Sequence, residues 1–235
     1  VYHDNIPANI GPVRSLRPYF IDWFMPYDAA IVHAGGSPEA LQAVRTLGLK
    51  DMDSVGSIMR RISQRYSPHN YYTTGQQVLD EMSRRGYSST FSGLPRKEAA
   101  PAEAPNATSI NLTVSSNLYN VGFRYDVASK SYLRSQGGGT HVDAESGAQL
   151  SPQVVVVPII GRRTHSNRIH TVYDTVGSGA VYVFQDGTVT KGTWHKASRT
   201  AQWELKDSAG QPLALNPGQT WFTMIEADGR VTYAP

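Results

Sequence analysis

The stretch GAVYVFQDGTVTKGTWHK (179–196) carries the pattern that decides the fold class. Runs rich in β-branched and aromatic residues lie on both sides of Asp186-Gly187. An Asp-Gly pair between two such runs is typical of a tight β-hairpin turn. We therefore predict two antiparallel strands, at 179–185 and 188–196.

The same alternation of short apolar runs and turns fills the sequence from Ile110 onward, where no convincing helix is found. QDG, SAGQP, NPG and ADG supply turns. Eight further strands are predicted, at 109–115, 120–126, 130–136, 153–160, 170–176, 200–207, 219–226 and 230–234. We expect this part to be a mainly antiparallel β-structure.

The N-terminal part carries helix signals. Ser15 is a candidate N-cap for a helix that runs to about Met25, where Pro26 ends it. AAIVHA (29–34) predicts a buried strand, and Gly-Gly then leads into a helix capped by Ser37. QQVLDEMSRRG (76–86) predicts a third helix. We expect short helices on a small sheet, and hence an α+β protein overall.

Residues 95–109, PRKEAAPAEAPNATS, are rich in Pro, Ala and Glu and show no apolar period. That composition is typical of a flexible linker. It predicts an α/β domain at 1–97, a linker at 98–109 and a β-rich domain at 110–235.

Composition narrows the classes of function. The 235 residues hold 22 Lys+Arg and 19 Asp+Glu, and no cysteine. No nucleic-acid partner is expected from so modest an excess of base, and disulfides and thiolate metal sites are excluded. VVVVPII (154–160) is too short to span a bilayer. The opening VYHDNIPANIGP (1–12) reads as the interior of a longer precursor.

Arg14 and Arg17 flank the predicted helix start at Ser15. Cations there oppose the helix dipole, so local propensity disfavours both arginines. An anion at this position would explain them, because backbone N–H groups and guanidinium groups would both favour it. The anion is either a ligand's phosphate or carboxylate, or an acid of the chain itself, such as Asp22 or Asp28.

Two loops in the N-terminal part add polar groups. His33, Gly35, Gly36 and Ser37 form a second candidate anion cradle, in which backbone can approach a ligand closely. Gly-Gly also occurs in such turns for geometry alone. His69 and Asn70 follow a proline in an aromatic-rich loop, where the histidine either acts chemically or bonds a carbonyl.

The β-rich part holds two further motifs. His141 and Asp143 project on one face of an extended segment, as a general base with its orienting carboxylate would. The pair supplies two metal ligands at most, so no metal and no cofactor are predicted. Trp194 and Lys196 share a strand face, where the tryptophan either stacks on a ligand or packs in the core.

These blocks together resemble a known family. GPVRSLRPYF (11–20), YDAAIVHAGGSPEAL (27–41), SPHNYYTTGQQVL (67–79), YDVASKSYLRSQGGGTHVDAESGAQL (125–150), GSGAVYVFQDGTVTKGTWHK (177–196) and LNPGQTWF (215–222) occur in the order expected of the YerB-like bacterial lipoproteins. Those proteins have N- and C-terminal family domains and no assigned function. The resemblance implies an extracytoplasmic protein at the cell envelope, held to the membrane by an N-terminal lipid that this chain does not carry. It also implies a domain boundary nearer 140–170.

The residues that match the family's pattern form the predicted site. They are Arg14, Ser15, Arg17, His33, Gly35, Gly36, Ser37, His69, Asn70, Tyr132, Arg134, His141, Asp143, Trp194 and Lys196.

Three functions fit these residues. The first is binding of an anionic small molecule or cell-wall component. The second is a hydrolase or transferase, with His33, His69 or His141 as general base, Asp143 orienting it and arginines stabilising negative charge. The third is an adaptor that binds a protein partner through its β-rich part.

Overall fold

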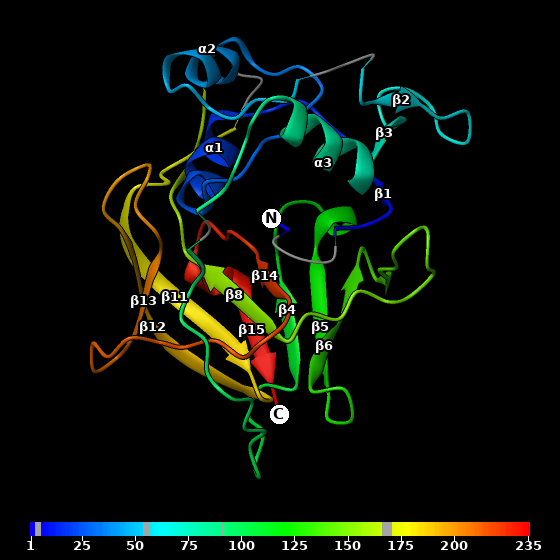
Figure 1. The fold of residues 1–235 in the computed structure, drawn as a ribbon. Coiled ribbons are helices and arrows are strands. Elements are labelled where there is room, and N and C mark those ends of the chain that lie inside the picture. Colours follow the sequence, from blue (N-terminus) through cyan, green and yellow to red (C-terminus); the bar gives the residue numbers. More distant parts are fainter. Residues whose placement is uncertain (3–5, 54–56, 91, 166–170) are drawn as a thin grey trace. The chain divides into compact units, whose positions relative to one another are not determined.

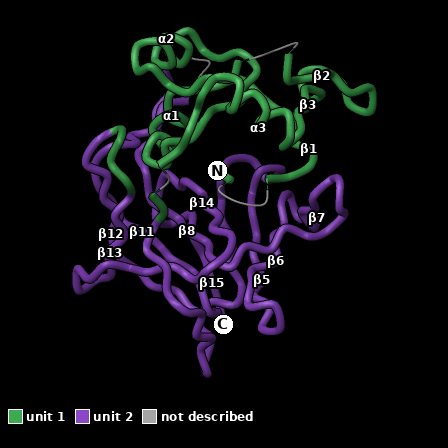
Figure 2. Tube along the Cα trace, viewed as in Figure 1, with its two compact units in different colours: residues 1–93, 199–202 green, residues 94–198, 203–235 purple. Residues whose placement is uncertain are grey.

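The computed structural model describes residues 1–2, 6–53, 57–90, 92–165 and 171–235. The chain forms two compact units (Figures 1 and 2). Unit 1 contains residues 1–93 and 199–202, and unit 2 contains residues 94–198 and 203–235.

Unit 1 is built from short helices and a small sheet. The sheet has the order β1-β3-β2, and all its pairs are antiparallel. Its elements are β1 (Asn9–Ile10), α1 (Pro18–Phe24), η1 (Met25–Tyr27), α2 (Pro38–Thr46), β2 (Arg60–Arg61), β3 (Tyr71–Thr74) and α3 (Gly75–Arg84). Two apolar clusters fill it, one around Met52 and the other around Ile21.

Local signals set the helices of unit 1. Ser37 accepts a hydrogen bond from Ala40 N and caps α2, as predicted. Thr74 and Gln77 form a reciprocal capping box at the start of α3. The predicted cap at Ser15 is wrong: α1 begins two residues later, with Arg17 as N-cap and Pro18 first in the helix.

The predicted strand at 29–34 is also wrong, because Ile31 makes only an isolated parallel bridge with Asp51. Instead of a strand at 29–34, the segment before α1 lies beside the Gly-Gly turn. Leu16 donates to Gly35 O and accepts from Ser37 N, so residues 14–16 run along 34–37.

Unit 2 contains two five-stranded sheets, with strand orders β13-β12-β11-β8-β14 and β15-β4-β5-β6-β7. The first sheet comprises β8 (Val154–Pro158), β11 (Gly177–Gln185), β12 (Thr188–Lys196), β13 (Glu204–Asp207) and β14 (Thr220–Phe222). The second comprises β4 (Ser109–Leu112), β5 (Val121–Asp126), β6 (Ser131–Gln136), β7 (Gly139–Thr140) and β15 (Val231–Ala234). β9 (Arg162–Thr164) and β10 (Thr171–Tyr173) form a separate ribbon, and η2 (Asn117–Tyr119) and η3 (Asp228–Arg230) are short 3-10 turns.

One apolar core joins the two sheets of unit 2. It combines residues such as Val155 and Phe184 of the first sheet with Ile110 and Phe123 of the second. The rings of Phe184 and Tyr233 lie 5.6 Å apart across this core. Every residue of β8 is buried, which explains why its sequence is continuously apolar rather than alternating.

The predicted fold class is confirmed. The β11–β12 hairpin turns at Asp186 and Gly187, which both have positive φ, as the turn of such a hairpin requires. Nearly all neighbouring strands are antiparallel, but β14 pairs with β8 in parallel. Residue 170 of the predicted strand 170–176 lies outside the described residues.

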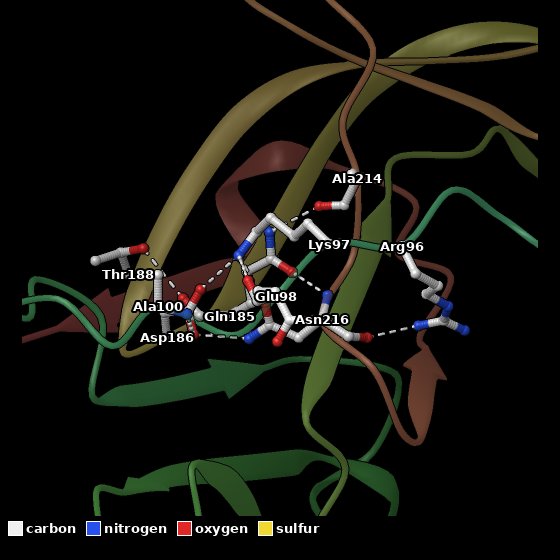
Figure 3. A network of polar contacts seen from close by, with 9 residues as sticks. All are labelled: Arg96, Lys97, Glu98, Ala100, Gln185, Asp186, Thr188, Ala214 and Asn216. Atoms are coloured by element: carbon white, nitrogen blue, oxygen red, sulfur yellow. Dashed lines mark hydrogen bonds and ion pairs between the residues drawn. The ribbon is translucent and has the colours of Figure 1, made fainter.

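The stretch that composition predicts to be a flexible linker is bonded into unit 2. Lys97 Nζ donates to Asp186 Oδ2 at 2.9 Å and to Asn216 Oδ1 at 2.6 Å (Figure 3). Ala100 N and Asn216 Nδ2 donate to Asp186 Oδ1. Arg96 Nη1 donates to Asn216 O. Composition misses these bonds because the partners of this stretch lie about 90–120 residues away in the sequence.

We expect Asp186→Asn to destabilise unit 2 by about 2–3 kcal/mol. The variant keeps a residue that tolerates positive φ but leaves the Lys97 ammonium without its carboxylate. The loss stays below that of a fully buried pair because the Lys97 side chain is 36% exposed. Urea unfolding measures it, with Asp80→Asn, an exposed carboxylate bonded to Gln76, as control. Equal stability of both variants would show that the network contributes nothing.

Candidate functional site

The polar side chains of unit 1 gather where the segment before α1 meets the β2–β3 hairpin. Val13 N donates to Tyr71 O and ties that segment to β3. Ile62 N donates to Asn70 O and closes the hairpin loop. Arg14, Arg61, His69, Asn70 and Tyr71 meet there, and we call them the Arg14–His69 cluster.

Arg61 is fixed from two sides. Its guanidinium lies 4.1 Å from the centre of the Tyr71 ring, which is opposite it in the strand register. Its Nη1 donates to Asn70 Oδ1 at 2.8 Å and to Ser67 Oγ at 3.4 Å. Asn70 is buried, so it holds the guanidinium in place.

Arg14 contacts His69 directly. Its Nη1 lies 2.7 Å from His69 Nδ1 and 3.3 Å from Nε2. Because a guanidinium only donates, the ring nitrogen must accept with a lone pair, which requires the neutral imidazole. Both side chains are exposed.

No carboxylate of the described residues lies within ion-pair distance of Arg14, Arg17 or Arg61. Arg17 Nη1 donates to Leu16 O. The two acids that the sequence offered as internal partners are engaged elsewhere: Asp22 pairs with Arg199 at 2.5 Å, and Asp28 pairs with Lys50.

The Gly-Gly turn is bonded to the chain's own acids. His33 is 2% exposed, with Nε2 2.8 Å from Asp51 Oδ1 and Nδ1 2.8 Å from Gly35 O. Gly35 N donates to Asp53 Oδ1 at 3.2 Å. Ser15 Oγ donates to Ala34 O. The N–H groups that could cradle a ligand at Gly35 and Ser37 therefore already have protein acceptors, and the Gly36 backbone pairs with Leu16.

Three of the predicted residues of unit 2 lie in its interior. Tyr132 is fully buried, and its ring lies 5.0 Å from that of Tyr125. Trp194 is 2% exposed, donates from its indole N–H to Ile159 O and packs against Trp203. Lys196 is fully buried and donates to Ser198 O at 2.7 Å.

His141 and Asp143 do not form the predicted pair. Asp143 Oδ1 accepts from Ser146 N at 2.8 Å and from Ser146 Oγ at 2.9 Å. These bonds hold the pKa of Asp143 below its usual range. His141 Nδ1 is buried without a hydrogen-bond partner in the part of the chain that the structure describes. Arg134, opposite His141, is also buried.

Sequence reasoning missed Arg61 and Trp221. Arg61 precedes the quoted loop by a few residues, and only the pairing of β2 with β3 brings it to Asn70. Trp221 lies within the strand predicted at 219–226, and its ring lies 4.4 Å from the guanidinium carbon of Arg134. The contact of Arg61 depends on the pairing of two strands, and that of Arg134 joins segments far apart in sequence; spacing carries no signal for either.

Two further classes of site have no candidate among the described residues. No group of three or more His, Asp or Glu side chains there could hold a metal ion. No helix there is long and apolar enough to cross a bilayer, since the longest, α3, has 10 residues.

Fold and site together define an α+β protein of two units, the first of which presents an arginine cluster that pairs with none of the described carboxylates. The chain belongs to the family of proteins of unknown function DUF3048. The N-terminal domain of that family matches residues 1–88 and its C-terminal domain matches residues 110–222.

A known sequence and a solved crystal structure, both of YerB from Bacillus subtilis, are similar to this chain. The chain is 27% identical over 233 residues to "Putative lipoprotein YerB" of Bacillus subtilis (strain 168), covering 96% of this chain and 69% of that protein. The crystal structure of YerB from Bacillus subtilis superposes with a TM-score of 0.86 at 23% identity, covering 98% of this chain and 79% of that one. The second likeness shows the fold.

We expect Asp28→Asn to destabilise unit 1 at neutral pH. Hydrogen bonds from Lys50 and Thr90 lower the pKa of Asp28 to about 2 from an unfolded value of 3.8. A lowered folded pKa gives stability that is complete above about pH 4 and is lost as the pH falls toward 2. Asparagine also suits the positive φ of 50° at this position.

Urea unfolding at pH 7, 4 and 2.5 measures this effect. The difference in free energy of unfolding between wild type and Asp28→Asn should shrink as the pH falls. A difference that stays constant with pH would mean that the charge of Asp28 does not matter.

Proposed function

We propose that this protein is an extracytoplasmic, lipid-anchored binding protein that holds an anionic component of the cell envelope at the Arg14–His69 cluster. The observation that carries the proposal is that Arg14 and Arg61 bond to adjacent residues of one loop and pair with no carboxylate of the described residues. The name of the Bacillus subtilis relative and the family resemblance support the location.

The sequence around the cluster strengthens its positive charge. Residues 6–21 contain Arg14 and Arg17 and no Asp or Glu, and residues 58–79 contain Arg60, Arg61 and Arg65 and no Asp or Glu. These are the two segments that meet at the cluster. A surface with one sign of charge concentrates ligands of the opposite sign, most strongly at low salt.

The chemistry favours an oxyanion as ligand. Guanidinium groups donate several N–H bonds in a plane, which matches the oxygens of phosphate and carboxylate groups. His69, once its contact with Arg14 is replaced by the ligand, adds another donor. The hydrolase or transferase hypothesis gains no comparable support, because His33 and Asp143 are bonded within structural turns.

We expect the double substitution Arg14→Ala with Arg61→Ala to weaken binding of polyphosphate or polyglutamate at least tenfold. Each charge-assisted hydrogen bond to an anion contributes about 1.5–3 kcal/mol. Titration calorimetry at 50 and 200 mM salt measures the dissociation constants. Comparing the two polymers distinguishes phosphate from carboxylate recognition.

Arg45→Ala with Arg124→Ala is the matched control. It removes the same charge from two exposed arginines, in α2 and β5, outside the cluster. Equal weakening by both double variants would contradict a defined site and indicate attraction to net charge alone. Absence of binding of either polymer by the wild type would contradict the proposal itself.

A further inference from the structure

Arg134 in β6 is a buried cation. Its side chain belongs to a residue only 4% exposed. Nη2 donates to Gln136 Oε1 at 3.1 Å, whereas Nε and Nη1 are buried and have no hydrogen-bond partner among the described residues. No carboxylate of the described residues pairs with it.

Two aromatic rings partly stabilise the positive charge of Arg134. The guanidinium carbon lies 4.4 Å from the centre of the Trp221 ring and 5.9 Å from that of Phe123. The faces of these rings attract a cation. The ring faces do not accept hydrogen bonds from N–H groups that point along the guanidinium plane. Nε and Nη1 of Arg134 therefore still have no acceptor among the described residues.

A third nitrogen lies close by, on His141. Its backbone N donates to Arg134 O at 3.1 Å, so the two residues are neighbours across the end of the β6–β7 pair. Both side chains lie by Trp221, since the His141 ring is 6.4 Å from the ring of Trp221. His141 Nδ1 is buried and has no hydrogen-bond partner among the described residues.

Buried polar groups in folded proteins are almost always hydrogen-bonded, because an unmet donor costs free energy. Burial lowers the pKa of Arg134 to about 10, so the guanidinium is still charged at neutral pH. The positive charge of Arg134 and the unbonded nitrogens of Arg134 and His141 would be satisfied by a hydrogen-bond acceptor that carries one negative charge. A carboxylate meets this need, whereas a dianionic phosphate would leave net negative charge in an apolar environment.

We propose that Arg134, His141 and Trp221 form a second binding site, in unit 2, that takes a single small carboxylate. The carboxylate accepts from the Arg134 guanidinium, and His141 donates to it from Nδ1. Gln136, His141 and Trp221 are half-buried, so the ligand enters past these side chains. The site lies within unit 2 and goes beyond the function proposed for the Arg14–His69 cluster.

Thermal unfolding of the full chain in sodium acetate tests the site, with sodium chloride and sodium phosphate at equal ionic strength as references. We expect acetate to raise the Tm saturably above both references. Arg134→Met, which keeps a long side chain and removes the charge, should lose the acetate response. It should also match or exceed the Tm of the wild type without acetate, because no buried charge is left unpaired.

Two controls separate this site from the rest of the chain. Arg124→Met changes an exposed arginine of the neighbouring strand β5 and should keep the response. Arg14→Ala with Arg61→Ala should also keep it, so a failure of the proposed cluster in unit 1 remains distinguishable. An equal acetate response in Arg134→Met, or a response to acetate no larger than to chloride, would overturn the proposal.

A direct readout covers the case in which Arg134→Met does not fold. The imidazole 1H–15N signals of His141 in the wild type should shift saturably with acetate. No shift would overturn the proposal, as would a crystal structure grown in acetate that shows only water on Nε and Nη1.

Discussion

The architecture of unit 2 depends on the hydrogen bonds that the carboxylate of Asp186 accepts. It lies in the turn of the central hairpin and accepts from Lys97, Ala100 and Asn216. Three segments distant in sequence are thereby joined at one buried point. A buried polar group that lacks its partner destabilises the folded state, so each segment holds the others in place. The hairpin fixes the sheet, and the same residue fixes the path of the chain that leads into it.

Several acidic residues of unit 1 already pair with particular bases, so they do not neutralise its other arginines. Asp22, Asp28 and Glu81 each pair with a base inside unit 1. Among the described residues, Arg14 and Arg61 pair with no acid, and both are exposed. Arg134 also pairs with no described acid, but it lies in an apolar interior. Salt screens the first kind of charge strongly and the second kind weakly, so the two places differ in how they respond to their surroundings.

Sequence patterns predict structure that depends on neighbouring residues and miss contacts that depend on the pairing of separate segments. The Asp186-Gly187 hairpin, the Ser37 cap and a helix at about 76–86 follow from neighbouring residues, and the structure has them, the helix as α3 at Gly75–Arg84. The strand predicted around Ile31 fails because residues 14–16 lie beside the Gly-Gly turn instead. In the candidate site, Arg14 and His69 are found from sequence, but Arg61 and Trp221 need the pairing of strands. The stretch 95–109 is a second example, because its composition gives no sign of the hydrogen bond from Lys97 to Asp186.

The order of strands in unit 2 has a consequence for how the chain matures. β14 and β15 come after every other strand, and each completes an edge of a different sheet. β14 lies beside β8, which precedes it by more than 60 residues, and β15 lies beside β4, which precedes it by about 120. The first sheet has its full set of strands only after residue 222 has left the ribosome, and the second only after residue 234. A nascent chain that stops short exposes two open edges, on which chaperones or proteases can act.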